Sequence, residues 1–384
     1  MRSKIISETQ PDPRARVTGK KRIFFAAIMI VLLLLALEGL VRVAARAGLV
    51  NIRTFAVSNE VTRITFVGNL DPFFGVWHLP LARVQVPTPE GEVIYETNAQ
   101  GMRDRSREFS SGARERVVVL GDSFVEGCYV AASNRFTDLL EQKTGIQFLN
   151  FGTSGGFGSI QEWQLYEHLA RQFDHTRVLL FLLPDNDFAD NDPVRHADRY
   201  QPALQKNNGT YTVTYPSPFR PELTRETRIK GGRAVRHRCY NHWLTMNLLV
   251  TFDYERLRIL NTSSYDGYTD EDMNQLLFTY AQILKDAEPR PLTIYIIPRD
   301  RDFIAFAAGK FRNRLTAELS EWASRRKGVK VVDLLPGFLA YMKAHNTPAK
   351  DFFLSFDPHW SPLGHQVAAD LVLASQPGLF PEAP

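Results

Sequence analysis

The sequence predicts an α/β domain built on a parallel sheet, because short apolar runs alternate with helical segments over much of its length. Five apolar runs, each closed by Gly, Pro, Asn or Asp or by the start of a helix, suit buried strands. They span residues 117–120, 147–150, 177–183, 292–297 and 329–333. A parallel sheet is covered on both faces, so we expect a three-layer α/β/α domain.

Helical segments fill the gaps between these runs. Four are expected from their apolar spacing, over residues 136–143, 159–173, 311–326 and 362–374. A fifth begins after Thr269, a favoured N-cap residue, and its first turn is acidic, as the helix dipole prefers. From about residue 190 to residue 264 polar and basic residues with Gly and Pro interrupt the alternation, which indicates an insertion.

The charge distribution excludes a basic body built to bind nucleic acid. The chain has 384 residues and a net charge of +4, yet residues 1–22 carry seven Lys or Arg against two acids. The rest of the chain therefore sums to −1. The basicity belongs to an N-terminal tail.

An apolar segment, residues 23–41, follows this tail directly. At about 1.5 Å per residue it spans the ~30 Å hydrocarbon core of a bilayer. We expect an uncleaved transmembrane anchor; the alternatives are a core helix, which should show a polar stripe, and a cleaved signal peptide, which is usually shorter. The tail is then cytoplasmic and the body is exported, to the periplasm if the cell is Gram-negative.

Residues 42–113 form an irregular lead-in between the anchor and the main domain. They are rich in Pro and Gly and contain short strand-like pieces at 63–67 and 92–95. We expect this lead-in to pack on the domain that follows.

Polar groups with catalytic potential stand after three of the expected strands and before the last helix. A Gly-Asp-Ser tripeptide ending at Ser123 follows the first strand, at the sheet edge where open α/β domains hold their ligands. The glycine-rich segment 150–156 follows the second strand and offers backbone N–H groups. Asn186 follows the third and offers a side-chain amide. Asp357 and His359, just before the last helix, supply a carboxylate and a base.

These blocks, in this order, resemble those of the SGNH (GDSL) hydrolase superfamily over roughly residues 114–376, apart from the insertion. The run from Asn98 to Asp104 is also similar to the lead-in of membrane-anchored bacterial members. The resemblance implies a flavodoxin-like sandwich of five parallel strands, which agrees with the number of expected strands.

The resemblance also implies roles for individual residues. Ser123 would be the nucleophile, His359 the general base and Asp357 its partner, while the N–H groups of Ser123 and Gly155 and the amide of Asn186 would form the oxyanion hole. In that chemistry the imidazole takes the serine proton and the carboxylate holds the imidazole in the right tautomer. The product of the first step is an acyl-enzyme.

Two departures from the family pattern bear on the substrate. One residue separates Asp357 from His359, where the family commonly has two, and Trp360 follows. This shorter block is similar to periplasmic proteins of the alginate O-acetyltransferase type, which leaves open whether water or a sugar hydroxyl accepts the acyl group. Pro184 stands two places before Asn186, where a glycine is usual.

Two other residues compete for the catalytic roles. Ser154 lies in a G-x-S-x-G pattern typical of the nucleophile elbow of α/β-hydrolases. That elbow runs directly into a helix, whereas Phe157 and Gly158 delay the helix here, and an elbow leaves Asn186 without a role. His365 is a second possible base, but we expect it to pack or cap within the last helix.

No metal or cofactor is expected. His237, Cys239 and His242 have an unfamiliar spacing for zinc, and the acidic run 185–192 lacks the glycine and terminal glutamate of a calcium loop. Cys128 and Cys239 permit one disulfide without indicating that it forms.

Six basic residues within 225–238, opposed only by Glu226, suit a solvated face. Contact with anionic headgroups or an acidic polysaccharide is the functional alternative.

Three functions follow from these residues. The first is an anchored serine esterase that removes O-acyl groups, such as acetyl, from a glycan or an envelope lipid. The second is an O-acyltransferase acting on an exported polysaccharide, which would need a membrane protein to supply the acyl group. The third is a silent module that binds acylated glycan, which has no physical need for the whole Ser, Gly, Asn, Asp and His set.

Overall fold

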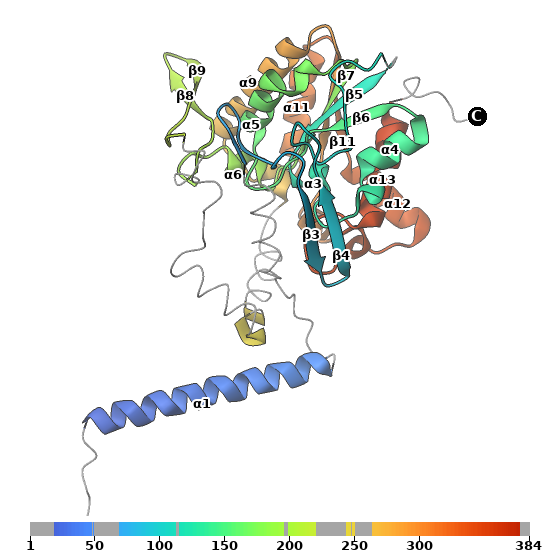
Figure 1. Ribbon diagram of the computed structural model, residues 1–384. Coiled ribbons are helices and arrows are strands. Elements are labelled where there is room, and N and C mark those ends of the chain that lie inside the picture. Colours follow the sequence, from blue (N-terminus) through green and yellow to red (C-terminus); the bar gives the residue numbers. More distant parts are fainter. Residues whose placement is uncertain are drawn as a thin grey trace, which may run out of the picture.

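A computed structural model of the chain describes residues 19–47, 49, 69–112, 115–195, 199–219, 243–246, 248–249 and 263–376. Its first element is the long helix α1 (Gly19–Arg46), which lies apart from the α/β domain (Figure 1). An 18-residue window within residues 20–46 of α1 has a mean hydropathy of 2.8, and the helix is long and apolar enough to cross a membrane. A cleaved signal sequence has the same properties, so the anchor stays a prediction.

The five expected strands form one parallel sheet, which confirms the predicted fold class. In chain order they are β5 (Arg116–Gly121), β6 (Gln147–Asn150), β7 (Arg177–Leu182), β10 (Leu292–Ile296) and β11 (Val329–Asp333). In space the order is β11-β10-β7-β5-β6, with β5 and β7 at the centre. Every residue of β5 and β10 is buried, as a sheet covered on both faces requires.

Helices cover both faces of this sheet (Figure 1). One face carries α5 (Ser159–His168), α9 (Asp270–Ala287) and α11 (Arg314–Ser324); the other carries α4 (Phe136–Thr144), α12 (Leu335–His345) and α13 (Pro362–Ser375). Short helices α3 (Ser123–Glu126), α6 (Asp187–Asp190) and α10 (Asp300–Ala307) follow β5, β7 and β10. This arrangement gives the three layers that the sequence predicts.

Some helix boundaries differ from the expected ones for local reasons. The helix expected over 311–326 begins at Arg314, because the side chain of Asn313 caps it by accepting from the Thr316 N–H at 3.0 Å. The helix expected over 159–173 ends at His168 and continues as a 3₁₀ turn. The helix after Thr269 begins as predicted, with the Thr269 hydroxyl accepting from the Asp272 N–H.

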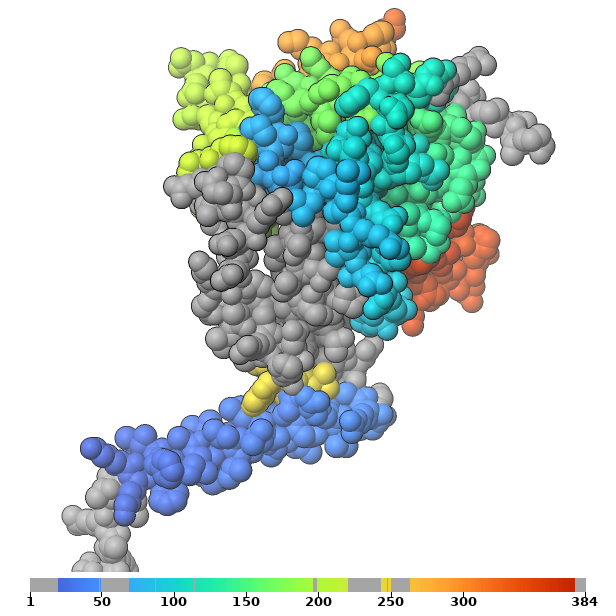
Figure 2. Space-filling model, in the orientation of Figure 1, coloured from blue at the N-terminus to red at the C-terminus, as the bar shows by residue number. Residues whose placement is uncertain are grey.

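The described part of the lead-in packs against the α/β domain and forms two hairpins (Figure 2). They are β1 (Asn69–Asp71) with β2 (Gly75–Trp77), and β3 (Arg83–Thr88) with β4 (Gly91–Glu96). The expected strand at 92–95 lies within β4, whereas the one at 63–67 lies outside the described residues.

A tight turn joins the second hairpin to the domain. Gly101 has φ +82°, and a Cβ atom there would lie 2.4 Å from the indole nitrogen of Trp77. The Asn98 side chain closes this turn by accepting from the N–H groups of Gln100 and Met102, both at 3.0 Å. Only glycine allows both this backbone conformation and this close approach.

The described part of the insertion contains one hairpin, β8 (Ala203–Asn207) with β9 (Thr210–Thr214). It reaches α9, where Lys206 and the Tyr211 hydroxyl both contact the carboxylate of Glu271. The basic run, the zinc candidates and Cys239 lie outside the described residues. The predicted domain boundaries and the disulfide therefore stay predictions.

Candidate active site

The candidate site lies where the strand order of the sheet reverses. The chain runs from β5 outward to β6, then returns to place β7 on the other side of β5. Ser123 follows β5 and Asn186 follows β7, so both stand at the carboxyl ends of the two central strands. Open α/β sheets bind their ligands at this reversal, because the loops separate there and leave a crevice.

Asp122 sets the direction of the short helix that carries Ser123. Its carboxylate accepts a hydrogen bond from the Phe124 N–H at 2.9 Å and so caps α3. Its second oxygen lies 3.4 Å from the Ser123 hydroxyl. Burial raises the pKa of Asp122 to about 6, although the nearby His359 and the Asn186 amide favour the ionised form.

The structure brings Ser123, His359 and Asp357 together in one hydrogen-bonded chain. The Ser123 hydroxyl lies 2.7 Å from Nε2 of His359. Nδ1 of the same ring bonds the carboxylate of Asp357, which also accepts from the His359 backbone N–H at 3.0 Å. A carboxylate at Nδ1 places the proton there and leaves Nε2 free to accept the serine proton.

Aromatic packing holds the histidine in this position. The ring of Phe124 lies 4.9 Å from that of His359 and meets the ring of Trp360 edge-on at 5.1 Å. Trp360 is fully buried, and its backbone pairs with Phe353 across the loop that carries Asp357. Trp360 therefore packs in the core and holds the loop that carries Asp357 and His359.

The three predicted oxyanion donors lie on three loops of this edge. Within the described residues, the N–H groups of Ser123 and Gly155 donate no hydrogen bond, so both are available to a ligand. The Asn186 amide donates to Asp190 at 3.1 Å, and its oxygen has no hydrogen-bond partner in the described part of the chain. Asp190 thus orients the amide of Asn186. The same amide also interacts with the carboxylate of Asp122, the residue before Ser123.

Buried acids lie behind the serine. Burial raises the pKa of Glu162 and of Asp187 well above the usual range, and each acid is further disfavoured as an anion by Asp122. Asp187 still accepts from the Leu183 N–H at 2.7 Å, which holds the start of the Asn186 loop. Neither oxygen of Glu162 has a hydrogen-bond partner among the described residues. The surroundings of Glu162 therefore favour its neutral form over the carboxylate.

The competing residues are placed differently. Ser154 is buried, and its hydroxyl has no hydrogen-bond partner among the described residues, so the structure brings no base to it. His365 is buried in α13, where Nδ1 accepts from the Phe136 N–H at 3.3 Å. Burial and nearby arginines lower the pKa of His365 to about 3, so it packs as a neutral ring.

No group of three or more His, Cys, Asp or Glu residues in the described ranges is placed to hold a metal ion. The four aspartates between 185 and 192 are used locally instead. Asp185, for example, pairs with Arg299 and Arg301 at the start of α10.

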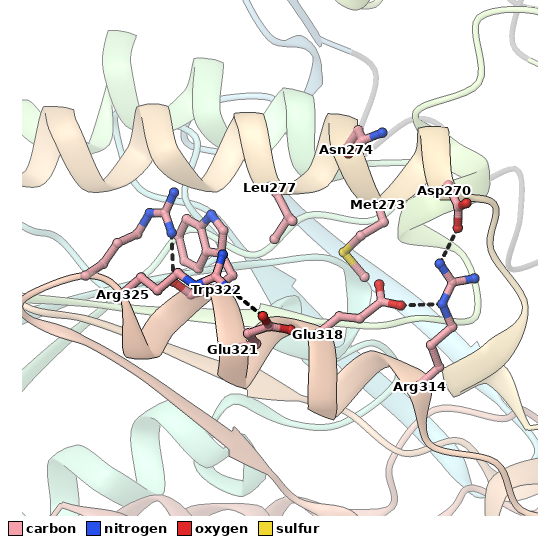
Figure 3. A pocket seen from close by; sticks show the side chains of 10 residues that line it. Asp270, Met273, Asn274, Leu277, Arg314, Glu318, Glu321, Trp322 and Arg325 are labelled. Carbon is pink, nitrogen blue, oxygen red and sulfur yellow. Dashed lines mark hydrogen bonds and ion pairs between the residues drawn. The ribbon is translucent and has the colours of Figure 1, made fainter.

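A second hollow, of about 880 Å³, lies between α9 and α11 (Figure 3). Met273, Leu277 and Trp322 line its floor, while its arginines pair with acids within it, such as Arg314 with Glu318. None of the predicted catalytic residues lines it, so it is separate from the site at the sheet edge.

Two buried residues of the lead-in contact the site, and sequence reasoning missed both. The Arg103 guanidinium donates to the carbonyls of Glu126, Gly127 and Val130 at the end of α3. His78 contacts Thr153 in the loop that carries Gly155. The similarity of residues 98–104 to a family lead-in was a signal for Arg103; no motif surrounds His78.

No protein-family model and no curated protein matches the chain. Solved structures similar to it include a member of the lipolytic G-D-S-L family from Veillonella parvula, at 12% identity and a TM-score of 0.37, covering 69% of this chain and 100% of the other. Another is the lipase/acylhydrolase from Enterococcus faecalis, at 13% identity and a TM-score of 0.35, covering 70% of this chain and 99% of the other. Similarity at this level of identity and TM-score defines no activity.

Proposed function

We propose that the chain is a membrane-anchored serine esterase of the SGNH type that acts outside the cytoplasm. The observation that carries this proposal is the continuous chain from the Ser123 hydroxyl through His359 to Asp357. The imidazole takes the proton as Ser123 attacks an ester carbonyl, and Asp357 stabilises the imidazolium that forms. The tetrahedral oxyanion is held by the N–H groups of Ser123 and Gly155 and the Asn186 amide.

The acyl-enzyme is then released by a second attack. In the first step His359 passes the serine proton to the leaving alcohol; in the second it takes a proton from the incoming hydroxyl and passes it to Ser123 as the acyl group leaves. Water as the acceptor gives an esterase, and a sugar hydroxyl gives an O-acyltransferase. A purely binding module is disfavoured, because recognition of an acyl group does not require a serine hydrogen-bonded to a histidine.

A group of aromatic side chains beside the site supports a glycan as the acyl carrier. Tyr200 stacks on Tyr215, and Phe219 packs edge-on against Tyr200 and is 39% exposed. The neighbouring Arg199 donates to the Gly155 carbonyl at 2.7 Å, which ties this group to the oxyanion loop. Exposed aromatic faces suit the flat C–H faces of sugar rings, and exposed apolar patches commonly mark binding sites.

The test follows acetyl release by the full chain in detergent from a chromogenic ester and from an acetylated oligosaccharide. Wild type is compared with Ser123→Ala and Ser154→Ala. We expect the loss of activity only in Ser123→Ala, by a factor of about 10³ or more, because Ser123 is the hydroxyl that is hydrogen-bonded to His359, whereas the Ser154 hydroxyl has no hydrogen-bond partner among the described residues. Loss only in Ser154→Ala would refute the assignment.

Product analysis with an added unacetylated oligosaccharide separates the two enzymatic outcomes. Free acetate alone indicates hydrolysis, whereas acetylated product indicates transfer. A wild type that releases and transfers no acyl group from either ester, and forms no acyl-enzyme, would contradict the proposal.

A further inference from the structure

His78 is a buried histidine that links the lead-in to the active-site loops. It directly follows β2 and is fully buried. Its Nδ1 lies 2.9 Å from the Gly101 carbonyl, and its Nε2 lies 3.0 Å from the Thr153 hydroxyl. The first contact is within the lead-in, and the second reaches the catalytic edge of the sheet.

The Gly101 carbonyl determines the protonation of one ring nitrogen. A carbonyl oxygen only accepts hydrogen bonds, so Nδ1 carries a proton and donates to Gly101. Nε2 accepts from the Thr153 hydroxyl in the neutral ring and donates to it in the imidazolium, so the contact is kept in both forms. The direction of the Thr153 side chain is thereby set by a residue outside the predicted hydrolase domain.

Thr153 lies in the loop that supplies a predicted oxyanion donor, two residues before Gly155. Its backbone N–H bonds the Gly121 carbonyl at 3.4 Å, beside the Ser123 loop. The preceding Gly152 packs so closely on α3 that a Cβ atom there would lie 2.1 Å from the Glu126 backbone nitrogen. A shift of Thr153 therefore changes the position of the Gly155 N–H relative to Ser123.

The same imidazole also lies against the nucleophile helix. Nε2 of His78 is 3.7 Å from the carboxylate of Glu126, the last residue of α3, and both side chains are fully buried. One ring thus contacts both the loop of Gly155 and the helix of Ser123. These two elements carry two of the three predicted oxyanion donors.

We propose that His78 is a positioning residue of the active site. Through the Thr153 hydroxyl it holds the Gly155 N–H where the tetrahedral oxyanion forms, and it thereby makes the lead-in part of the catalytic unit. This inference rests on the proposed esterase function. Catalysis of this kind is sensitive to small displacements, because a donor acts only at hydrogen-bond distance from the developing charge.

Two conservative variants separate the two contacts of the ring. The amide of His78→Asn reaches the place of Nδ1 and keeps the contact with Gly101. The amide of His78→Gln reaches the place of Nε2 and can accept from Thr153. His78→Ala removes both contacts. Thr153→Val removes the hydroxyl at nearly constant volume, so it tests the contact with His78 even if His78→Ala does not fold.

The chain offers a matched control in His175. This buried histidine makes the same pair of contacts, with Nδ1 2.6 Å from the Phe173 carbonyl and Nε2 2.9 Å from the Tyr166 hydroxyl. It lies beyond α5 and touches neither the Gly155 loop nor α3 in the described structure. His175→Ala is therefore expected to lower the melting temperature without slowing the chemistry of folded protein.

The experiment measures the rate at which a fluorophosphonate labels Ser123 in the full chain in detergent, together with the melting temperature. The phosphonyl oxygen needs the oxyanion hole, so the rate reports its geometry without requiring the natural substrate. We expect His78→Ala and Thr153→Val to be labelled about 10-fold to 100-fold more slowly. His78→Gln should recover most of the rate, and His78→Asn should not.

Three results would overturn the inference while leaving the esterase proposal intact. The first is a labelling rate in His78→Asn equal to that in His78→Gln. The second is a loss of labelling rate in His78→Ala no larger than that in His175→Ala. The third is a double variant, His78→Ala with Thr153→Val, in which the two losses of labelling rate add. A wild type that is not labelled at Ser123 would instead refute the proposed function, and with it this inference.

Discussion

At the scale of single residues, the site depends on groups whose orientation is set by a neighbour. Asp357 orients His359, and Asp190 orients the amide of Asn186. Each aspartate restricts rotation of the side chain that it contacts, and for His359 this leaves Nε2 facing the Ser123 hydroxyl before a substrate arrives. Such preorganisation costs nothing at the moment of reaction, which is why fixed donors lower barriers so effectively.

Asn186→Ala is expected to lower kcat by about 10²- to 10³-fold with a much smaller change in KM, because the lost donor acts on the transition state. Steady-state kinetics on a chromogenic ester measures both. Asn191→Ala is the matched control: its amide donates to the Ser159 hydroxyl at 2.8 Å and its oxygen accepts from the Ile160 N–H, at the start of α5. It should lower the melting temperature and leave kcat nearly unchanged. Equal kcat losses in both variants would contradict the role of Asn186.

At the scale of elements, the lead-in is bound to the helix that carries the nucleophile. Arg103 is fully buried, and its guanidinium lies 3.6 Å from the centroid of the Tyr95 ring. It satisfies the carbonyls at the carboxyl end of α3, at distances of 2.9 Å to Glu126 and 2.8 Å to Val130. A helix of one turn cannot satisfy these groups itself, so it depends on this cap.

Arg103→Met should therefore destabilise the protein by about 3–5 kcal/mol, because the buried carbonyls of Glu126, Gly127 and Val130 all lose their donor. Chemical denaturation of the full chain, followed by tryptophan fluorescence, measures this change. Arg105→Met is the control on the same segment. Its side chain is 54% exposed and pairs with Asp138 and Glu141, so a loss below about 1 kcal/mol is expected. Similar losses in the two variants would show that Arg103 is not a buried cap.

At the scale of the whole molecule, three buried acidic side chains lie near the edge of the sheet that carries Ser123. Asp122, Glu162 and Asp187 are all buried, and burial raises the pKa of each. A carboxyl group with a raised pKa binds its proton more tightly in the folded state than in the unfolded one. Its contribution to stability is therefore fully present below the unfolded pKa and is lost as the pH rises toward the folded pKa.

Glu162→Gln tests this stability effect, because glutamine has no proton to lose. The melting temperature of wild type should fall as the pH rises from 4.5 to 8, by about 2–4 °C for each kcal/mol lost. The fall should be smaller in Glu162→Gln. Glu321→Gln, on the surface of α11 with a side chain 65% exposed, should follow wild type. A fall as steep in Glu162→Gln as in wild type would contradict the buried, protonated state.

Much of the fold could be predicted from the sequence, because its signals are local. Each strand of the central sheet contains an apolar run, as in 178–182, and three of the four blocks of polar residues stand at the end of one. The hairpin β8–β9 and the short helices α10 and α12 were not predicted. They are brief and lack a long apolar period, and α12 begins at a Pro-Gly pair that is also typical of a turn.

The sequence by itself determined the parallel sheet and pointed to Ser123 and Asn186, because these two residues follow strands whose carboxyl ends meet at one edge. It pointed to Asp357 and His359 through the block of residues before the last helix. Only the tertiary structure decided which other residues contact the loops that carry these residues. His78 and Thr153 are separated by 75 residues, and the lead-in that carries His78 has no periodic pattern. Which buried groups pair depends on how separate elements pack, and this packing leaves no local signal in either segment.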